Sequence, residues 1–126
     1  MEESNASGPT WLLRRKQFEA NEKGAKVAVL GTMIRDFDSM IAQLEEQIAA
    51  EEDRTRIKDS RHPMYSMVAK AAAKRRQNLL VSVAHTRSML EVAKRELDAV
   101  TAQLLDLAPI QNNPQILTAQ AISVAR

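Results

Sequence analysis

One apolar stripe with a strict spacing constrains the fold more than any other feature of this 126-residue sequence. Apolar side chains recur alternately every third and fourth residue over residues 27–48, without interruption. A repeat of 3.5 residues keeps one narrow seam of an α-helix turned toward a partner helix, as in a coiled coil. The predicted seam of this first helix consists of Val27, Leu30, Ile34, Phe37, Ile41, Leu44 and Ile48.

A second stripe follows a polar break. The segment 58–63 is polar and ends in Pro63, through which the preceding helix is not expected to continue. Beyond the break the alternating spacing of three and four residues returns and runs to Leu107. The predicted seam of the second helix includes Ala72, Leu79, Val83, Leu90, Ala93, Leu97, Val100 and Leu104.

The two stripes agree on the position of one turn. If the turn is centred on residue 60, facing positions have numbers that add to 120, such as Ile41 with Leu79 and Leu30 with Leu90. Every such pair joins an a position to a d position, as expected for antiparallel helices. The sequence therefore predicts an all-α fold in which two long helices form an antiparallel coiled-coil hairpin. A parallel homodimer is the alternative, and the matching registers disfavour it.

The breaks in these patterns give the boundaries. Pro9 and Thr10 are typical of a helix start, and Pro109 and Pro114 interrupt the second stripe. We expect the segment after Pro109 to be flexible. In chain order we predict a polar lead at 1–9, a hairpin at 10–107 and a tail at 108–126. Within the hairpin we predict a helix at about 10–56, a turn at about 57–63 and a helix at about 64–107.

The composition agrees with a long, thin core. Apolar residues make up 44% of the chain but aromatic residues only 3%, and large aromatics supply much of the core of compact domains. The absence of cysteine excludes disulfides and thiolate chemistry. No apolar run approaches the roughly 20 residues of a membrane span, and the polar N-terminus is unlike a signal peptide. We expect a cytoplasmic protein.

The charge is distributed unevenly between the two halves. Residues 1–60 hold 9 Lys/Arg and 12 Asp/Glu, whereas residues 61–126 hold 9 Lys/Arg and 4 Asp/Glu. The second half contains a basic run, Lys70, Lys74, Arg75 and Arg76. The hairpin register would place this run beside the acidic stretch 45–53, so we favour attraction within the chain. Phosphate binding, as in nucleic-acid-associated proteins, is the alternative.

The sequence offers no constellation typical of catalysis. There is no glycine-rich phosphate loop and no metal-ligand spacing, and His62 and His85 stand far apart. Adjacent acids such as Glu51 and Glu52 point in different directions on a helix, so they are not expected to form an acid–base pair. We predict no enzyme activity, no catalytic or metal-binding residues, no cofactor and no small-molecule substrate.

The start of the first helix carries an aromatic pair, Trp11 and Phe18, with basic residues beside it. Two interpretations are open: the pair closes the end of the seam, or it is exposed and anchors a partner, since aromatic and arginine residues dominate binding hot spots. The candidate partner-binding residues are Trp11, Arg14, Arg15, Lys16, Phe18, Arg75 and Arg76.

Several stretches resemble a known family in order and spacing. They are LRRKQF (13–18), NEKGAKVA (21–28), MIRDF (33–37), IAAEEDRT (48–55), IKDSRHPMY (57–65) and AKAAAKRRQNLL (69–80). The stretch around the turn is the most informative, because heptad spacing does not dictate it. On these stretches the chain resembles the FliJ family of the flagellar type III export apparatus. Gly24 and Gly31 depart from the good helix formers expected there, and the tail matches no familiar pattern.

The resemblance implies a specific set of partners. FliJ-like proteins are stalk-like coiled coils that bind the hexameric export ATPase, promote its assembly, and contact the membrane export gate and the chaperones of export substrates. A cytoplasmic position at the membrane face through those partners would follow. The alternative is a coiled-coil scaffold that self-associates through spare apolar surface such as Met33, Met40, Met67 and Met89, or that associates with nucleic acid.

Overall fold

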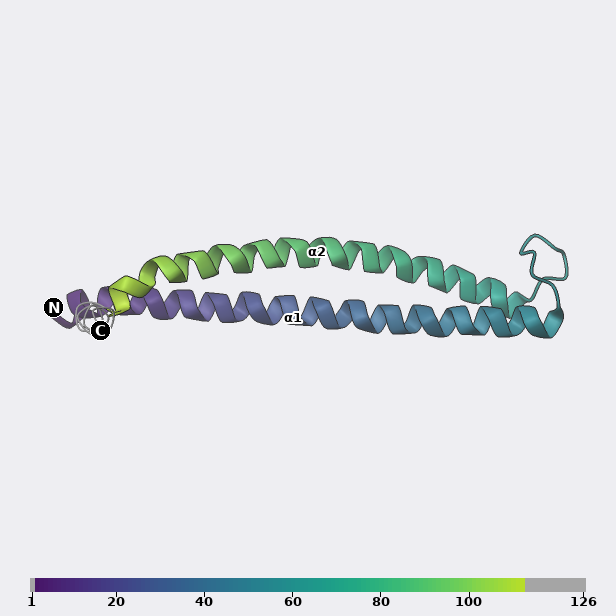
Figure 1. The fold of residues 1–126 in the computed structure, drawn as a ribbon, viewed down its shortest axis with the longest axis horizontal. Coiled ribbons are helices and arrows are strands. Elements are labelled where there is room, and N and C mark those ends of the chain that lie inside the picture. The colour runs from purple at the N-terminus through teal and green to yellow at the C-terminus, as the bar shows by residue number, and fades with distance from the viewer. Residues whose placement is uncertain (1, 113–126) are drawn as a thin grey trace, which may run out of the picture. The chain divides into compact units, whose positions relative to one another are not determined.

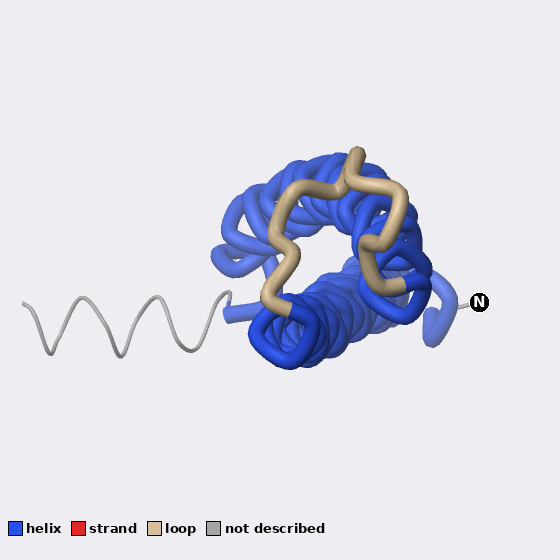
Figure 2. The backbone as a smooth tube through the Cα atoms, turned by 90° about the vertical axis from the view of Figure 1, so that its right-hand side faces the viewer, coloured by secondary structure: helices blue, strands red, loops and turns tan. Residues whose placement is uncertain are grey.

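The protein is an all-α helical hairpin, with no strand in the part of the chain that the structure describes (Figure 1). The computed structural model describes the backbone of residues 2–112 and the side chains of residues 10–107. Helix α1 spans Glu2–Thr55 and helix α2 spans Met67–Asn112. The connection between them, residues 56–66, is the loop that joins the two helix ends in Figure 2. The predicted fold class is therefore confirmed.

The hairpin divides into two units. The turn unit is Ala28–Glu91, which holds the connection and the helix segments on either side of it. The terminal unit combines Met1–Val27 with Val92–Arg126. In each unit a segment of α1 packs against a segment of α2.

The core of the turn unit is the seam between its two helix segments. Its buried side chains alternate at heptad spacing, and they are mostly aliphatic, with Leu30, Ile34, Ile41 and Leu44 from α1 facing Ala69, Ala72, Val83 and Thr86 from α2. Thr86 is polar, but its hydroxyl donates a hydrogen bond to the carbonyl of Ser82 at 2.7 Å. A buried hydroxyl with a partner avoids the cost of an unsatisfied polar group.

The core of the terminal unit is smaller. Its buried side chains in the described part of the chain are Leu13, Ala93 and Val100. At its edge Lys23 Nζ lies 3.7 Å from Glu96 Oε1, an oxygen that is buried and has no hydrogen-bond partner. The separation suits an ion pair but is longer than a hydrogen bond. Lys23, which interrupts the stripe in the sequence, therefore has a cross-helix partner.

Both ends of the helices differ from the prediction. Helix α1 begins at Glu2 rather than at Pro9 or Thr10, and α2 continues through Pro109 to Asn112 rather than ending near residue 107. Proline fixes φ near the helical value, so a helix can continue through it, but the residue removes one hydrogen bond and its ring crowds the carbonyl four residues earlier. The predicted flexible tail lies outside the described residues from 113 onward.

The second helix also begins later than predicted, at Met67 rather than near residue 64. Ser66 sets this start, because its side-chain oxygen accepts a hydrogen bond from the Ala69 N–H at 3.1 Å, which is an N-cap. Pro63 lies within the connection instead. There Asp59 closes a tight turn by accepting a hydrogen bond from the Arg61 N–H at 2.9 Å.

Candidate functional site

Four of the candidate partner-binding residues share one face of α1 in the terminal unit. Trp11, Arg14, Arg15 and Phe18 are spaced i, i+3, i+4 and i+7, and neighbours at that spacing lie on one side of an α-helix. All four are exposed. We call these residues the aromatic–arginine face. Leu13, which is 4% exposed, points to the other side, toward the seam.

The two aromatic side chains of this face are open to solvent. Trp11 is 58% exposed and Phe18 is 65% exposed. Among the described residues they do not close the end of the seam, so the structure favours the interpretation of an exposed anchor. The Arg15 guanidinium lies over the Trp11 ring, 5.3 Å from its centroid. A cation over an aromatic ring contributes about 0.5–1 kcal/mol at an exposed site, enough to bias both side chains toward one arrangement.

Lys16 does not belong to the aromatic–arginine face. Its side chain is half-buried on the seam side of α1 and its Nζ lies 3.3 Å from the Glu19 carboxylate. It therefore has an intrahelical partner already. Such exposed or half-exposed pairs contribute at most about 1 kcal/mol, so this pairing is weak.

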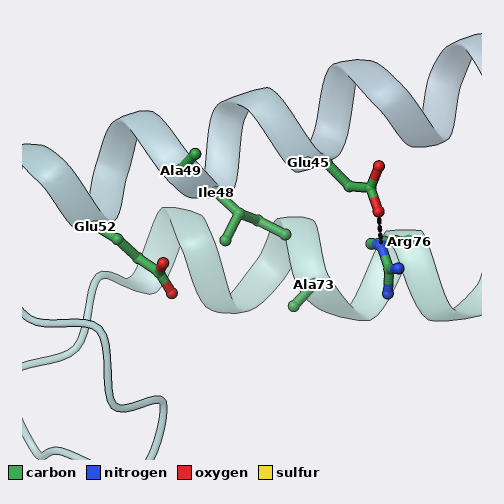
Figure 3. Close-up of a pocket in the computed structure, with 6 residues that line it drawn as sticks. All are labelled: Glu45, Ile48, Ala49, Glu52, Ala73 and Arg76. Carbon is green, nitrogen blue, oxygen red and sulfur yellow. Dashed lines mark hydrogen bonds and ion pairs between the residues drawn. The ribbon is translucent and has the colours of Figure 1, made fainter.

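Arg75 and Arg76 diverge in the structure of the turn unit. Arg75 is exposed, whereas the Arg76 Nε donates to Glu45 Oε2 at 2.8 Å. Figure 3 shows this pair bridging α1 and α2 beside a shallow groove, whose remaining lining is Ile48, Ala49, Glu52 and Ala73. Arg76 therefore stabilises the pairing of the two helices, and only part of the predicted attraction between the basic run and the acidic stretch is formed.

The fifteen predicted seam residues are all buried or half-buried. Seven are half-buried and eight are buried, and none is exposed. The cross-helix ion pairs Glu45–Arg76 and Lys23–Glu96 each lie within one residue of the predicted register. A third pair, Asp38 with Arg87 at 3.6 Å, is more offset, as the long arginine side chain permits. The seam therefore holds the helices together and is not available to a partner.

Sequence reasoning missed a polar cluster where the connection meets the helices. Glu51 accepts hydrogen bonds from the Arg54 side chain at 2.9 and 3.1 Å and from the Ser66 hydroxyl at 2.7 Å. Beside it the Tyr65 hydroxyl donates to Glu52 at 2.7 Å. We call these five residues the turn latch. The serine directly before the second apolar stripe, an N-cap type of residue, was the available signal for it.

The hydrogen bonds of the turn latch change the acid–base behaviour of its members. The hydrogen bonds from Arg54 and Ser66 hold the pKa of Glu51 at about 2, below its ordinary value of 4.5. The hydrogen bond to Glu52, together with burial, raises the pKa of Tyr65. Glu51 is therefore an ionised acceptor and Tyr65 a neutral donor at neutral pH.

Other chemistry is sparse in the described part of the chain. No group of three or more His, Cys, Asp or Glu side chains there is placed to hold a metal ion. His62 and His85 are both exposed. Neither α1 nor α2, over its described length, is apolar enough to cross a membrane.

Comparison with known proteins gives no match to a family model, a curated protein or a solved structure. The candidate site is therefore defined by its own geometry. That site is the aromatic–arginine face.

Proposed function

We propose that this protein is a stalk-like component of a flagellar type III export apparatus, of the FliJ kind, and that it binds the export ATPase through the aromatic–arginine face. The proposal rests on the stretches of resemblance, one of which, residues 13–18, contributes three residues to that face. A helical hairpin suits a role as a linker between larger partners.

The observation that carries the proposal is the exposure of Trp11 and Phe18. The chain has four aromatic residues, of which Tyr65 is buried and Phe37 half-buried in the turn unit. The other two stand exposed on the same face of one helix, beside two exposed arginines. Exposing large apolar side chains to water is unfavourable, and aromatic residues with arginine are enriched in binding hot spots. This combination is typical of a surface that a partner covers.

The chemistry of the face also indicates which kind of partner surface would bind it. Arg14 and Arg15 supply guanidinium groups that bind carboxylates with two parallel hydrogen bonds. The ATPase surface that receives them therefore presents acidic side chains around apolar pockets for the two rings. The export gate and the substrate chaperones are the further partners of this proposal, and through them the protein works at the cytoplasmic face of the membrane.

A second candidate function is a self-associating scaffold. Met33, Met40 and Met89 flank the seam of the turn unit, and each is 39% exposed. Methionine suits adaptable apolar contacts, including contacts between copies of one chain. Light scattering after size exclusion separates the two candidates, because the export component is a monomer before it meets the ATPase and the scaffold is a dimer or larger.

The test is a pull-down of the export ATPase from the same genome. The full chain should retain the ATPase, and the double variant Trp11→Ala with Phe18→Ala should lose it. The matched control is Val29→Ala with Val81→Ala, which removes two exposed apolar side chains, 58% and 62% exposed, from other positions on the hairpin. Equal retention by both variants, or no retention by the unaltered chain, would contradict the proposal.

A further inference from the structure

A second unpaired surface lies in the turn unit, around the connection. Five exposed cations lie in the connection and the first two turns of α2: Arg56, Lys58, Arg61, Lys70 and Lys74. We call these residues the basic tip. Among the described residues, one of these cations has an acidic partner in an ion pair: the Asp59 carboxylate lies 3.9 Å from Arg61. Both side chains of that pair are exposed, so the pair is weak.

Four acids lie near the basic tip, and two of them accept hydrogen bonds within the turn latch. Glu51 and Glu52 accept the hydrogen bonds of the turn latch from Arg54, Ser66 and Tyr65. Asp53 and Asp59 are the exposed acids that remain there. Arg54 balances the charge of Glu51, so the five cations of the basic tip face three acids, Glu52, Asp53 and Asp59. The excess of positive charge that remains attracts an anionic partner.

Exposed apolar side chains stand among these cations. Met67 and Met64, at 76% and 71% exposed, are the two most exposed large apolar residues in the part of the chain that the structure describes. Val68 beside them is 47% exposed. A surface with both cations and methionines suits a partner that has an anionic layer and an apolar layer beneath it.

Helix geometry places the two kinds of side chain together. Met67, Lys70 and Lys74 are spaced i, i+3 and i+7 in the first two turns of α2, so they share one side of the helix. The buried Ala69 and Ala72 mark the seam side of the same turns. The shared side of Met67, Lys70 and Lys74 therefore looks away from the seam and is open to a partner.

We propose that the basic tip, with Met64, Met67 and Val68, binds the surface of an anionic phospholipid bilayer directly. Lysine and arginine bind lipid phosphates while apolar side chains enter the boundary between headgroups and acyl chains. Nucleic acid fits the surface less well, because the tip exposes no Trp, Tyr or Phe ring on which a base could stack, and phosphate contacts alone do not use the methionines. The proposal goes beyond the export role, since it needs no protein partner at the membrane.

The experiment is co-sedimentation of the full chain with phosphatidylcholine vesicles, with and without phosphatidylglycerol as the anionic lipid. The chain should bind only the anionic vesicles, and added salt should weaken binding, because screening shortens the reach of exposed charges. Each cation near an anionic surface contributes about a fivefold factor to the partition coefficient. The variant Lys70→Glu with Lys74→Glu should therefore lower the coefficient by about 25-fold or more.

Two further variants keep the test decisive. Met64→Ser with Met67→Ser should weaken binding without changing its salt dependence, since it removes only apolar contact. Arg14→Glu with Arg15→Glu makes the same charge change as the lysine variant but lies in the terminal unit, and it should keep vesicle binding. Circular dichroism checks that each variant remains helical.

Three results would overturn the proposal. One is equal binding to neutral and anionic vesicles, or to neither. Another is an equal loss of binding in the Arg14/Arg15 and Lys70/Lys74 variants, which would mean that vesicle binding depends only on the net charge of the chain. The third is displacement of the chain from anionic vesicles by duplex DNA at equal phosphate concentration, which would make the tip a nucleic-acid surface. The ATPase pull-down is independent of all three, so the two proposals can fail separately.

Discussion

The Ser66 hydroxyl donates a hydrogen bond to a Glu51 carboxylate oxygen at 2.7 Å, and the same serine oxygen accepts the N–H of Ala69. One side chain thereby caps the start of α2 and ties it to the last turn of α1. Because Arg54 donates to the same carboxylate, the pKa of Glu51 is about 2 and its side chain remains ionised at mildly acidic pH. The adjacent acids of the turn latch, Glu51 and Glu52, therefore have a structural role.

This ionised carboxylate makes hairpin stability depend on pH in a predictable direction. The folded pKa of Glu51, about 2, lies below its ordinary value of 4.5. The stabilising contribution is therefore fully present above pH 4.5 and is lost as the pH falls toward 2. Glu51→Gln should lower the melting temperature at neutral pH and flatten its decline over that acid range, as measured by circular dichroism.

The matched control is Glu46→Gln, which removes an exposed acid from the same helix. It should keep the acid decline of the unaltered chain. If the decline were equally flat in both variants, the turn latch would not be its source.

Adjacent residues of α1 should differ sharply in their contribution to stability. Leu30 is 4% exposed in the seam, and its neighbour Val29 is 58% exposed. Leu30→Ala should lower the free energy of unfolding by about 2–5 kcal/mol, because it removes buried methyl groups and leaves a cavity. Val29→Ala should change it by less than about 0.5 kcal/mol. Urea denaturation of both variants measures the difference, and comparable losses would contradict the seam.

The heptad spacing was sufficient to predict the hairpin because burial is periodic. Apolar positions such as Ile41 recur about once per turn on the side of the helix that a partner helix covers, so their spacing alone locates the seam. The matching of two stripes also located the turn to within a few residues. No comparable pattern marks where a helix ends, which is why Pro9 and Pro109 misled the prediction of the ends.

The candidate site was only partly predictable for a different reason. The residue types at Trp11 and Phe18 suggested binding, but the sequence left open whether the rings close the seam or face solvent. Arg76 and Lys16 were grouped with the partner-binding residues by charge, and the structure pairs them with Glu45 and Glu19. Such pairings depend on side-chain rotamers and on the exact register, which composition does not specify.

The end of α1 carries backbone strain that substitution should relieve. Arg56 has φ of 60°, in the left-handed region, and its N–H bonds to the Glu52 carbonyl at 2.8 Å. This hydrogen bond closes the helix with a residue whose Cβ makes the left-handed conformation unfavourable, whereas glycine adopts that conformation freely. Arg56→Gly should raise the free energy of unfolding by about 1 kcal/mol. Lys58→Gly, in the same connection but without positive φ, should give no gain in urea denaturation.

The register of the turn unit can be tested by crosslinking, since the chain has no native cysteine. Ile41→Cys with Leu79→Cys should form a disulfide within one chain under mild oxidation, because the two positions face each other across the seam. The control, Ile41→Cys with Thr86→Cys, is displaced by two helical turns and should not close within one chain. Crosslinks only between chains at high dilution would contradict the hairpin.

The measurement that tests the central claim most directly is the activity of the export ATPase as the protein is added. The unaltered chain should stimulate the activity, and Arg14→Glu with Arg15→Glu should weaken stimulation at least tenfold, with the largest effect at low salt, where exposed charges act furthest. Lys70→Glu with Lys74→Glu, an equal change of charge in the turn unit, should leave stimulation intact. Loss of stimulation in the lysine variant alone, with helicity unchanged in both, would contradict the claim that the aromatic–arginine face binds the ATPase.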